Sequence, residues 1–137
     1  MKVLLLFLAI KILIFNNFTN AKSEQNQELK LSPSAVKSFF IYISSDRKTS
    51  DRFLVTEDGI GTFTWYCPQK LCFPASEKIY AKPCSKINNN KSCKIFAVGR
   101  KVKWKNLGNT KTTSIKFKQS ITYIEMKKKL KVHDLIN

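Results

Sequence analysis

Residues 53–104 read FLVTEDGIGTFTWYCPQKLCFPASEKIYAKPCSKINNNKSCKIFAVGRKVKW. This stretch contains all four cysteines, both tryptophans and three of the four glycines of the 137-residue chain. Disulfides, aromatic side chains and glycine-dependent turns are the features that most constrain a small domain. We therefore expect this stretch to specify the fold, and the flanking segments to supply export and charge.

Strand and turn signals in this stretch predict two β-hairpins separated by a helix. The first hairpin pairs residues 53–56 with 60–66, because Asp58-Gly59 supplies the positive φ that a tight turn requires. The second pairs residues 93–98 with 101–105 across Gly99-Arg100. Between them, residues 75–87 have a helical pattern, and we expect that helix to end near Ala81 or to be distorted at Pro83.

The flanks add further helices. Ser32 and Pro33 are typical of a helix start, and the apolar side chains that follow have helical spacing, which predicts a helix over residues 33–44. Residues 114–117 are expected to add a strand and residues 120–136 a helix. The predicted class is α+β: a small disulfide-stapled domain of helix, β-hairpin, helix and β-hairpin, with a C-terminal helix.

The N-terminus has the pattern of a secretory signal peptide. Lys2 precedes an apolar run, and Thr19-Asn20-Ala21 offers a cleavage site, so we assign residues 1–21 to the signal. Lys11 interrupts the run, which leaves it too short to span a membrane. We expect a flexible N-terminus at 22–30, the stapled domain at 31–105 and a basic C-terminal extension at 106–137, in the periplasm or secreted, with no transmembrane span after signal removal.

The four cysteines of an exported chain are expected to form disulfides, because the compartment is oxidising. Cys67 and Cys72 are separated by four residues, and Cys84 and Cys93 by eight. Neither spacing is typical of zinc sites, and the single histidine, His133, is remote in sequence, so no metal or cofactor is predicted. Of the three possible connectivities we favour the two local pairs.

The chain has a formal charge of +16, from 25 basic and nine acidic residues. One candidate anion-binding group is the stripe Lys101, Lys103 and Lys105 with the adjacent Arg100, and a second is Lys127, Lys128 and Lys129. Arginine, the better bidentate ligand for phosphate, occurs only three times, which argues against nucleic acid as the partner. The alternative is that the lysine excess has no binding role and reflects an A- and T-rich genome. In that case the lysines would be the solvent-facing residues of strands whose aromatic residues form the core.

The central motif resembles that of a group of exported proteins. CKIFAVGRKVKW at residues 93–104, preceded by Tyr66-Cys67, Cys72 and Cys84, resembles small exported proteins of unassigned function in Gram-negative bacteria, especially alphaproteobacteria. It is similar, more loosely, to a periplasmic domain in which a helix-borne cysteine bonds one on the next strand, which implies the Cys84–Cys93 pairing. The resemblance implies no catalytic residue, and Pro83 departs from the alanine-rich helix of those proteins.

No arrangement of residues in the sequence is typical of an enzyme. His133 lies beside Asp134 near the C-terminus and is interpreted as a surface residue, and the cysteine spacing is not that of thiol–disulfide oxidoreductases. We expect an exported non-enzymatic protein that binds an anionic envelope component or another envelope protein. The alternative is a secreted hydrolase, or a hydrolase inhibitor, built on the cysteine-rich hairpins.

Overall fold

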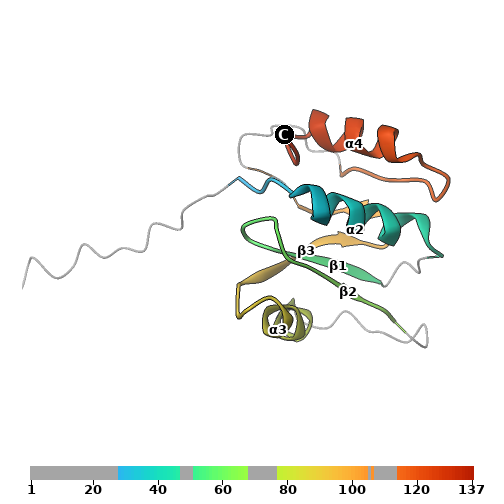
Figure 1. The fold of residues 1–137 in the computed structure, drawn as a ribbon. Helices are drawn as coiled ribbons and strands as arrows, with labels where there is room; N and C mark the ends of the chain where they lie inside the picture. The colour runs from blue at the N-terminus through green and yellow to red at the C-terminus, as the bar shows by residue number, and fades with distance from the viewer. Residues whose placement is uncertain (1–27, 47–50, 68–76, 105, 107–113) are drawn as a thin grey trace, which may run out of the picture.

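A computed structural model describes residues 28–46, 51–67, 77–104, 106 and 114–137 (Figure 1). In chain order the elements are α2 (Pro33–Ser44), β1 (Arg52–Thr56), β2 (Thr62–Trp65), α3 (Glu77–Ile87), β3 (Cys93–Val98), β4 (Lys101–Val102) and α4 (Tyr123–Val132). The predicted α+β class is confirmed. The predicted signal peptide lies outside the described residues and stays a prediction.

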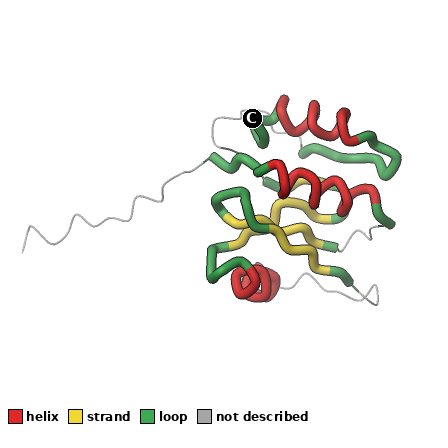
Figure 2. The backbone as a smooth tube through the Cα atoms, in the orientation of Figure 1, coloured by secondary structure: helices red, strands yellow, loops and turns green. Residues whose placement is uncertain are grey.

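The four strands form one antiparallel sheet in the order β2-β1-β3-β4 (Figure 2). Leu54 in β1 is paired with Phe63 of β2 on one side and with Ile95 of β3 on the other. The two predicted hairpins therefore share one sheet through the non-local β1–β3 pair. The β1–β3 register shifts between Phe53 and Leu54, which is the signature of a β-bulge.

Helices cover both faces of this sheet, with α2 and α4 on one side and α3 on the other (Figure 1). The core under α2 is organised around Phe39, which is fully buried. The ring centroid of Phe39 lies 5.2 Å from that of Phe53, 5.1 Å from that of Phe96 and 5.6 Å from that of Phe117. Aromatic pairs at such distances add to the stability gained from buried area. One α2 side chain thus holds strands β1 and β3 and the C-terminal segment together.

The second core lies under α3 and contains a disulfide. Cys84 of α3 is bonded to Cys93 of β3, which confirms this predicted pair. Beside it the fully buried Tyr80 packs edge-on against Trp65, with ring centroids 5.0 Å apart. Cys67 is buried and its sulfur is not a free thiol. Its expected partner Cys72 lies outside the described residues, so the 67–72 pairing stays a prediction.

Helix α3 runs through Pro83 to Ile87. Of the two predicted alternatives, an end near Ala81 is therefore wrong, and a distortion at Pro83 stays a prediction. Proline lacks the N–H that would bond the carbonyl of residue 79, and a proline inside a helix costs about 3 kcal/mol. Burial of Tyr80 before the proline and the Cys84 disulfide after it hold both halves on the sheet. Tertiary contacts therefore override the local break.

Strand β4 is shorter than the predicted 101–105 and ends at Val102. The amides of Lys103 and Trp104 both donate to the carbonyl of Phe96, at 2.7 and 3.3 Å, which interrupts the regular ladder. Part of the predicted strand 114–117 continues the sheet instead. Lys116 forms a β-bridge with Lys101, and the Val102 amide donates to the Ile115 carbonyl at 2.9 Å.

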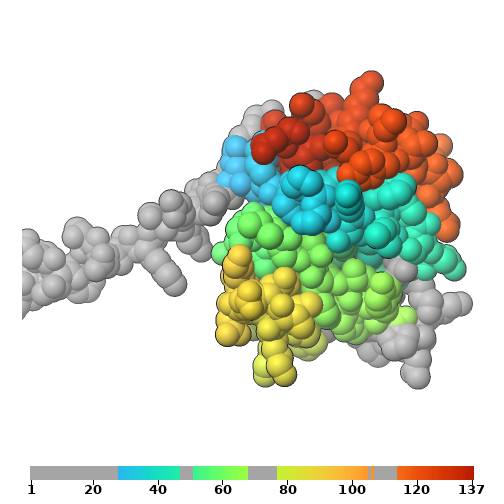
Figure 3. All heavy atoms as spheres, in the orientation of Figure 1, coloured from blue at the N-terminus to red at the C-terminus, as the bar shows by residue number. Residues whose placement is uncertain are grey.

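The folded domain extends beyond both predicted boundaries. Leu29, placed in the flexible segment 22–30 by the sequence analysis, is fully buried in the main core. Residues 114–137 of the predicted extension 106–137 do not lie outside the domain, because their apolar side chains complete the same core and they pack directly on α2 (Figure 3). These side chains are Ile115, Phe117, Met126, Leu130, Leu135 and Ile136.

The side chain of Asn106 connects three segments of backbone and is itself buried. Its Oδ1 accepts from the Leu29 amide at 2.9 Å and from the Trp104 indole at 3.0 Å. Its Nδ2 donates to the carbonyls of Leu29 at 3.0 Å and Asp134 at 2.9 Å. All four hydrogen-bonding positions of the amide are used. Asn106 therefore joins the two ends of the folded chain.

Replacing Asn106 should strongly destabilise the protein. Asn106→Ala leaves buried backbone groups of Leu29 without partners, which we expect to cost about 3 kcal/mol of unfolding free energy. Asn106→Asp should also be destabilised, because it turns an acceptor toward two carbonyl oxygens. Urea unfolding measures both effects. The exposed Gln119→Ala should stay within about 0.5 kcal/mol of the parent, and an equally stable Asn106→Ala would contradict the role.

Removing the Cys84–Cys93 disulfide should loosen α3 selectively. The bond closes a loop with a sequence separation of nine residues, for which we expect a loss of about 2–3 kcal/mol in the Cys84→Ala/Cys93→Ala variant. Native-state hydrogen exchange should then accelerate in α3 more than in α2, because α2 packs in the other core. Equal acceleration in both helices would show that the two cores open together.

The turn between β1 and β2 is held by Asp58 and Gly59. Gly59 has φ +72°, and an added Cβ would overlap the Lys30 carbonyl, so the predicted Asp-Gly turn is required by both conformation and space. Asp58 accepts from Lys91 Nζ at 2.6 Å and from Thr56 Oγ1 at 2.5 Å. These two hydrogen bonds, the Lys91 bond first, lower the pKa of Asp58 from 3.8 to about 2.

Asp58 should contribute stability that depends on acid pH. Because its folded pKa lies below its unfolded value, the contribution is complete above pH 3.8 and is lost as the pH falls toward about 2. The side chain is 32% exposed, so solvent screening limits the effect to about 1 kcal/mol. Asp58→Asn should lower the free energy of unfolding at neutral pH. It should also reduce the dependence of that free energy on pH below about 3.8, which we call the acid limb. The exposed Glu28→Gln, with the same charge change, should leave that limb unchanged.

Candidate functional site

The two predicted lysine groups meet at one edge of the sheet, through a third segment. Lys101 of the first group forms a β-bridge with Lys116. Lys129 of the second group extends its ammonium to 3.5 Å from the Lys116 carbonyl oxygen. Lysines that are far apart in sequence therefore lie beside one another. Lys116 was not among the predicted site residues.

Alternation along residues 115–118 explains why these lysines face solvent. Ile115 and Phe117 are buried in the main core, and Lys116 and Lys118 are exposed between and after them. Successive side chains of an extended segment point to opposite sides, so burial of the apolar pair directs the lysines outward. This period-two pattern was the sequence signal that could have identified Lys116 and Lys118.

Helix α4 positions the second lysine group, Lys127 to Lys129, because burial of its apolar face turns these lysines toward solvent. Met126 and Leu130, four residues apart, are fully buried, which leaves the intervening lysines exposed. Lys129 lies over the Phe117 ring at 5.8 Å and so faces the sheet edge. Lys127 lies over the Tyr123 ring at 5.8 Å, and Tyr123 packs on Phe40 of α2. Lys127 therefore faces away from the sheet edge and is not brought to the other lysines.

Arg100 has a structural role that the sequence analysis did not foresee. Its Nε donates to the carbonyl of Ile43 at 2.9 Å, and a terminal nitrogen donates to that of Ser45 at 2.6 Å. Both acceptors lie at the C-terminal end of α2, where helix carbonyls lack intrahelical partners. Arg100 caps this helix, so we leave it out of the anion-binding set. Lys105 lies outside the described residues.

Four predicted lysines remain, and with Lys116 and Lys118 they make what we call the basic surface: Lys101, Lys103, Lys116, Lys118, Lys128 and Lys129. Lys101 is half-buried and the other five are exposed. Within the described part of the chain none of the six forms an ion pair, whereas Lys30, Lys91 and Lys94 are paired with carboxylates elsewhere. The sequence has twelve basic and no acidic residues between Glu77 and Glu125, which accounts for the absence of compensating charge.

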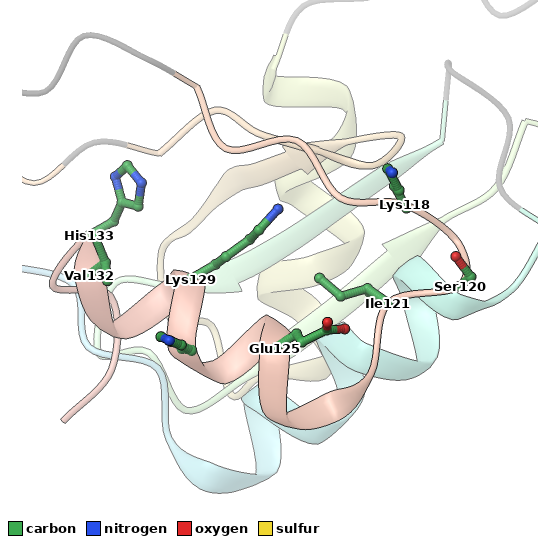
Figure 4. A pocket seen from close by; sticks show the side chains of 8 residues that line it. Lys118, Ser120, Ile121, Glu125, Lys129, Val132 and His133 are labelled. Carbon is green, nitrogen blue, oxygen red and sulfur yellow. The ribbon is translucent and has the colours of Figure 1, made fainter.

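A hollow of about 640 Å³ opens beside the basic surface, between α4 and the segment 118–121 (Figure 4). Its lining includes Lys118, Lys128 and Lys129 with a single carboxylate, Glu125. Ile121 and Val132 provide apolar wall, and Ser120 and His133 complete the lining. Three ammonium groups against one carboxylate leave the hollow positively charged.

Glu125 is committed to the start of α4. Its Oε2 accepts from the Thr122 amide at 3.0 Å and the Thr122 hydroxyl at 2.9 Å, and the Thr122 hydroxyl in turn accepts from the Glu125 amide at 3.2 Å. This is a capping box. The Thr122 amide, then its hydroxyl, hold the pKa of Glu125 below its ordinary value of 4.5, and Lys129 contributes less. The carboxylate therefore serves the helix and is not paired with the lysines.

His133 is half-buried at the C-terminal cap of α4, at one end of the hollow. Ser120 lines the opposite end, so the only histidine of the chain is not next to this hydroxyl (Figure 4). The hydrolase alternative is not tested by this arrangement and stays a prediction. Among the described residues no group of three or more His, Cys, Asp or Glu side chains could hold a metal ion.

No protein-family model matches the chain, and no significantly similar curated protein or solved structure was found. The resemblance of the cysteine motif to exported bacterial proteins therefore stays a prediction. In the described part of the chain, every helix is too short or too polar to cross a bilayer. Functional inference thus rests on the geometry of the basic surface and the hollow.

Proposed function

We propose that this is an exported, non-enzymatic protein that binds an anionic lipid surface of the cell envelope through its basic surface. The observation that carries the proposal is the Lys101–Lys116 bridge with Lys129 beside it. It gathers unpaired lysines from β4, the segment 114–118 and α4 at one edge of the sheet. A partner protein with an acidic face is the competing ligand.

The charge arrangement suits a surface better than a compact ligand. Each lysine close to an anionic membrane contributes about 1 kcal/mol, and the contributions of several lysines on one side accumulate. The six are attached to a sheet edge and a packed helix, so little backbone ordering is needed on binding. The Cys84–Cys93 disulfide is typical of proteins in oxidising compartments and supports a periplasmic or secreted location.

The proposal predicts salt-sensitive binding to anionic vesicles. The protein should cosediment with phosphatidylcholine vesicles only when they contain phosphatidylglycerol. Affinity should fall about tenfold or more between low and physiological ionic strength, because exposed charges are screened. The triple variant Lys101→Gln/Lys103→Gln/Lys116→Gln should bind at least about tenfold more weakly.

The chain offers a matched control on the opposite face. Lys78, Lys82 and Lys86 are exposed on α3, across the sheet from α4 (Figure 1). Changing these three to Gln removes the same charge and should reduce vesicle binding by less than about threefold. Binding that is indifferent to salt would contradict the proposal. Equal losses in the two triple variants would show that total charge, and not the basic surface, determines binding.

A further inference from the structure

We propose that the hollow between α4 and segment 118–121 is a binding site for a phosphate monoester that carries an apolar group, such as a phosphatidic acid headgroup with the start of its chains. This inference rests on the proposed function, because it assigns one specific lipid contact to a protein proposed to bind anionic surfaces. It goes further by placing that contact in a cavity and defining its chemistry.

The ammonium groups come from two separate elements and converge on one space. Lys118 follows the sheet-edge segment, and Lys129 projects from α4 toward it (Figure 4). Contact with the Phe117 ring and the Lys116 carbonyl fixes the direction of the Lys129 side chain. Lysines that approach from two sides bind a multiply charged phosphate more favourably than a monovalent carboxylate, because each acts as a point charge.

The carboxylate in the hollow offsets only part of this charge. Glu125 Oε2 is held by the Thr122 amide and hydroxyl, and Glu125 forms no ion pair with the lysines that line the hollow within the described chain. An anion would therefore not need to displace an existing lysine–carboxylate pair. Entry of a phosphate adds the first direct counter-charge to Lys118 and Lys128.

The size and walls of the hollow indicate a ligand larger than a free ion. Its volume of about 640 Å³ lies within the range of about 300–1,000 Å³ that is typical of small-molecule sites. Ile121 is half-buried and Val132 is 55% exposed on the wall, so both have apolar area to cover. A phosphate with an attached apolar group would use both parts of the site. Inorganic phosphate would use only the lysines.

The hollow is also continuous with the proposed membrane-binding surface. Lys129 lines the hollow and contacts Lys116, which belongs to the sheet edge. A lipid in the hollow would therefore lie beside the surface that faces the bilayer. This position favours a lipid as the source of the phosphate monoester over a soluble metabolite of the same chemistry.

The test is an NMR titration of the full ¹⁵N-labelled chain at constant ionic strength, with dihexanoylphosphatidic acid below its micellar concentration or with inorganic phosphate. Amide shifts should concentrate at Ser120, Ile121, Glu125 and Val132, and phosphatidic acid should bind about tenfold more tightly than phosphate. Lys118→Gln/Lys128→Gln should weaken both ligands about tenfold. Among the described residues, neither of these two exposed lysines has a side-chain hydrogen bond, ion pair or ring contact. Val132→Ser should weaken phosphatidic acid only.

The control variant Lys101→Gln/Lys103→Gln lies outside the hollow. It should leave phosphatidic acid affinity within about twofold while vesicle binding falls, which separates the hollow from the wider surface. Absence of shifts at the hollow with both ligands, or equal affinity for phosphate and phosphatidic acid, would overturn the inference. If the parent protein still binds anionic vesicles in that case, the proposed function stands. If the parent protein does not bind vesicles but phosphatidic acid still shifts the amides of the hollow, the proposed function alone is overturned.

Discussion

Four hydrogen bonds to one buried amide close the fold where its two ends meet. Asn106 satisfies backbone groups of Leu29 and Asp134 that have no strand partner, and it holds the Trp104 indole against the core. The segment 114–118 and α4 lie in the chain between Asn106 and Asp134. The positions of Lys116, Lys118, Lys128 and Lys129 therefore depend on this closure.

Hydrophobic packing makes the basic surface part of a rigid layer. Phe39 of α2 contacts Phe117, and the Phe117 ring also carries Lys129. Phe117 therefore connects Lys129 to the hydrophobic core, so this lysine is attached to a packed part of the domain. Arg100 is a second charged side chain with a structural contact: it lies beside the lysine stripe and caps the C-terminal end of α2. Binding at such a surface loses little conformational entropy.

The sequence predicted those features of the fold that depend on residues close together in the chain. Ser32-Pro33 predicted the start of α2, Asp58-Gly59 the first turn, and cysteine spacing the Cys84–Cys93 bond. The β1–β3 pairing, the passage of α3 through Pro83 and the burial of the C-terminal segment depend on partners distant in sequence. The hollow was missed for the same reason, since α4 and the segment beside it form a cavity only after they pack.

The closure at Asn106 gives the folded chain the topology of a nearly complete ring. Its Nδ2 donates to carbonyls at both ends, and the Leu31 amide also bonds the Leu135 carbonyl at 2.8 Å. Because the two ends of the folded chain lie side by side, the same arrangement of helices and strands does not require the chain to start and finish at this point. A short peptide linking the two ends, with new termini opened at another surface turn, would preserve every strand pairing in a circularly permuted protein.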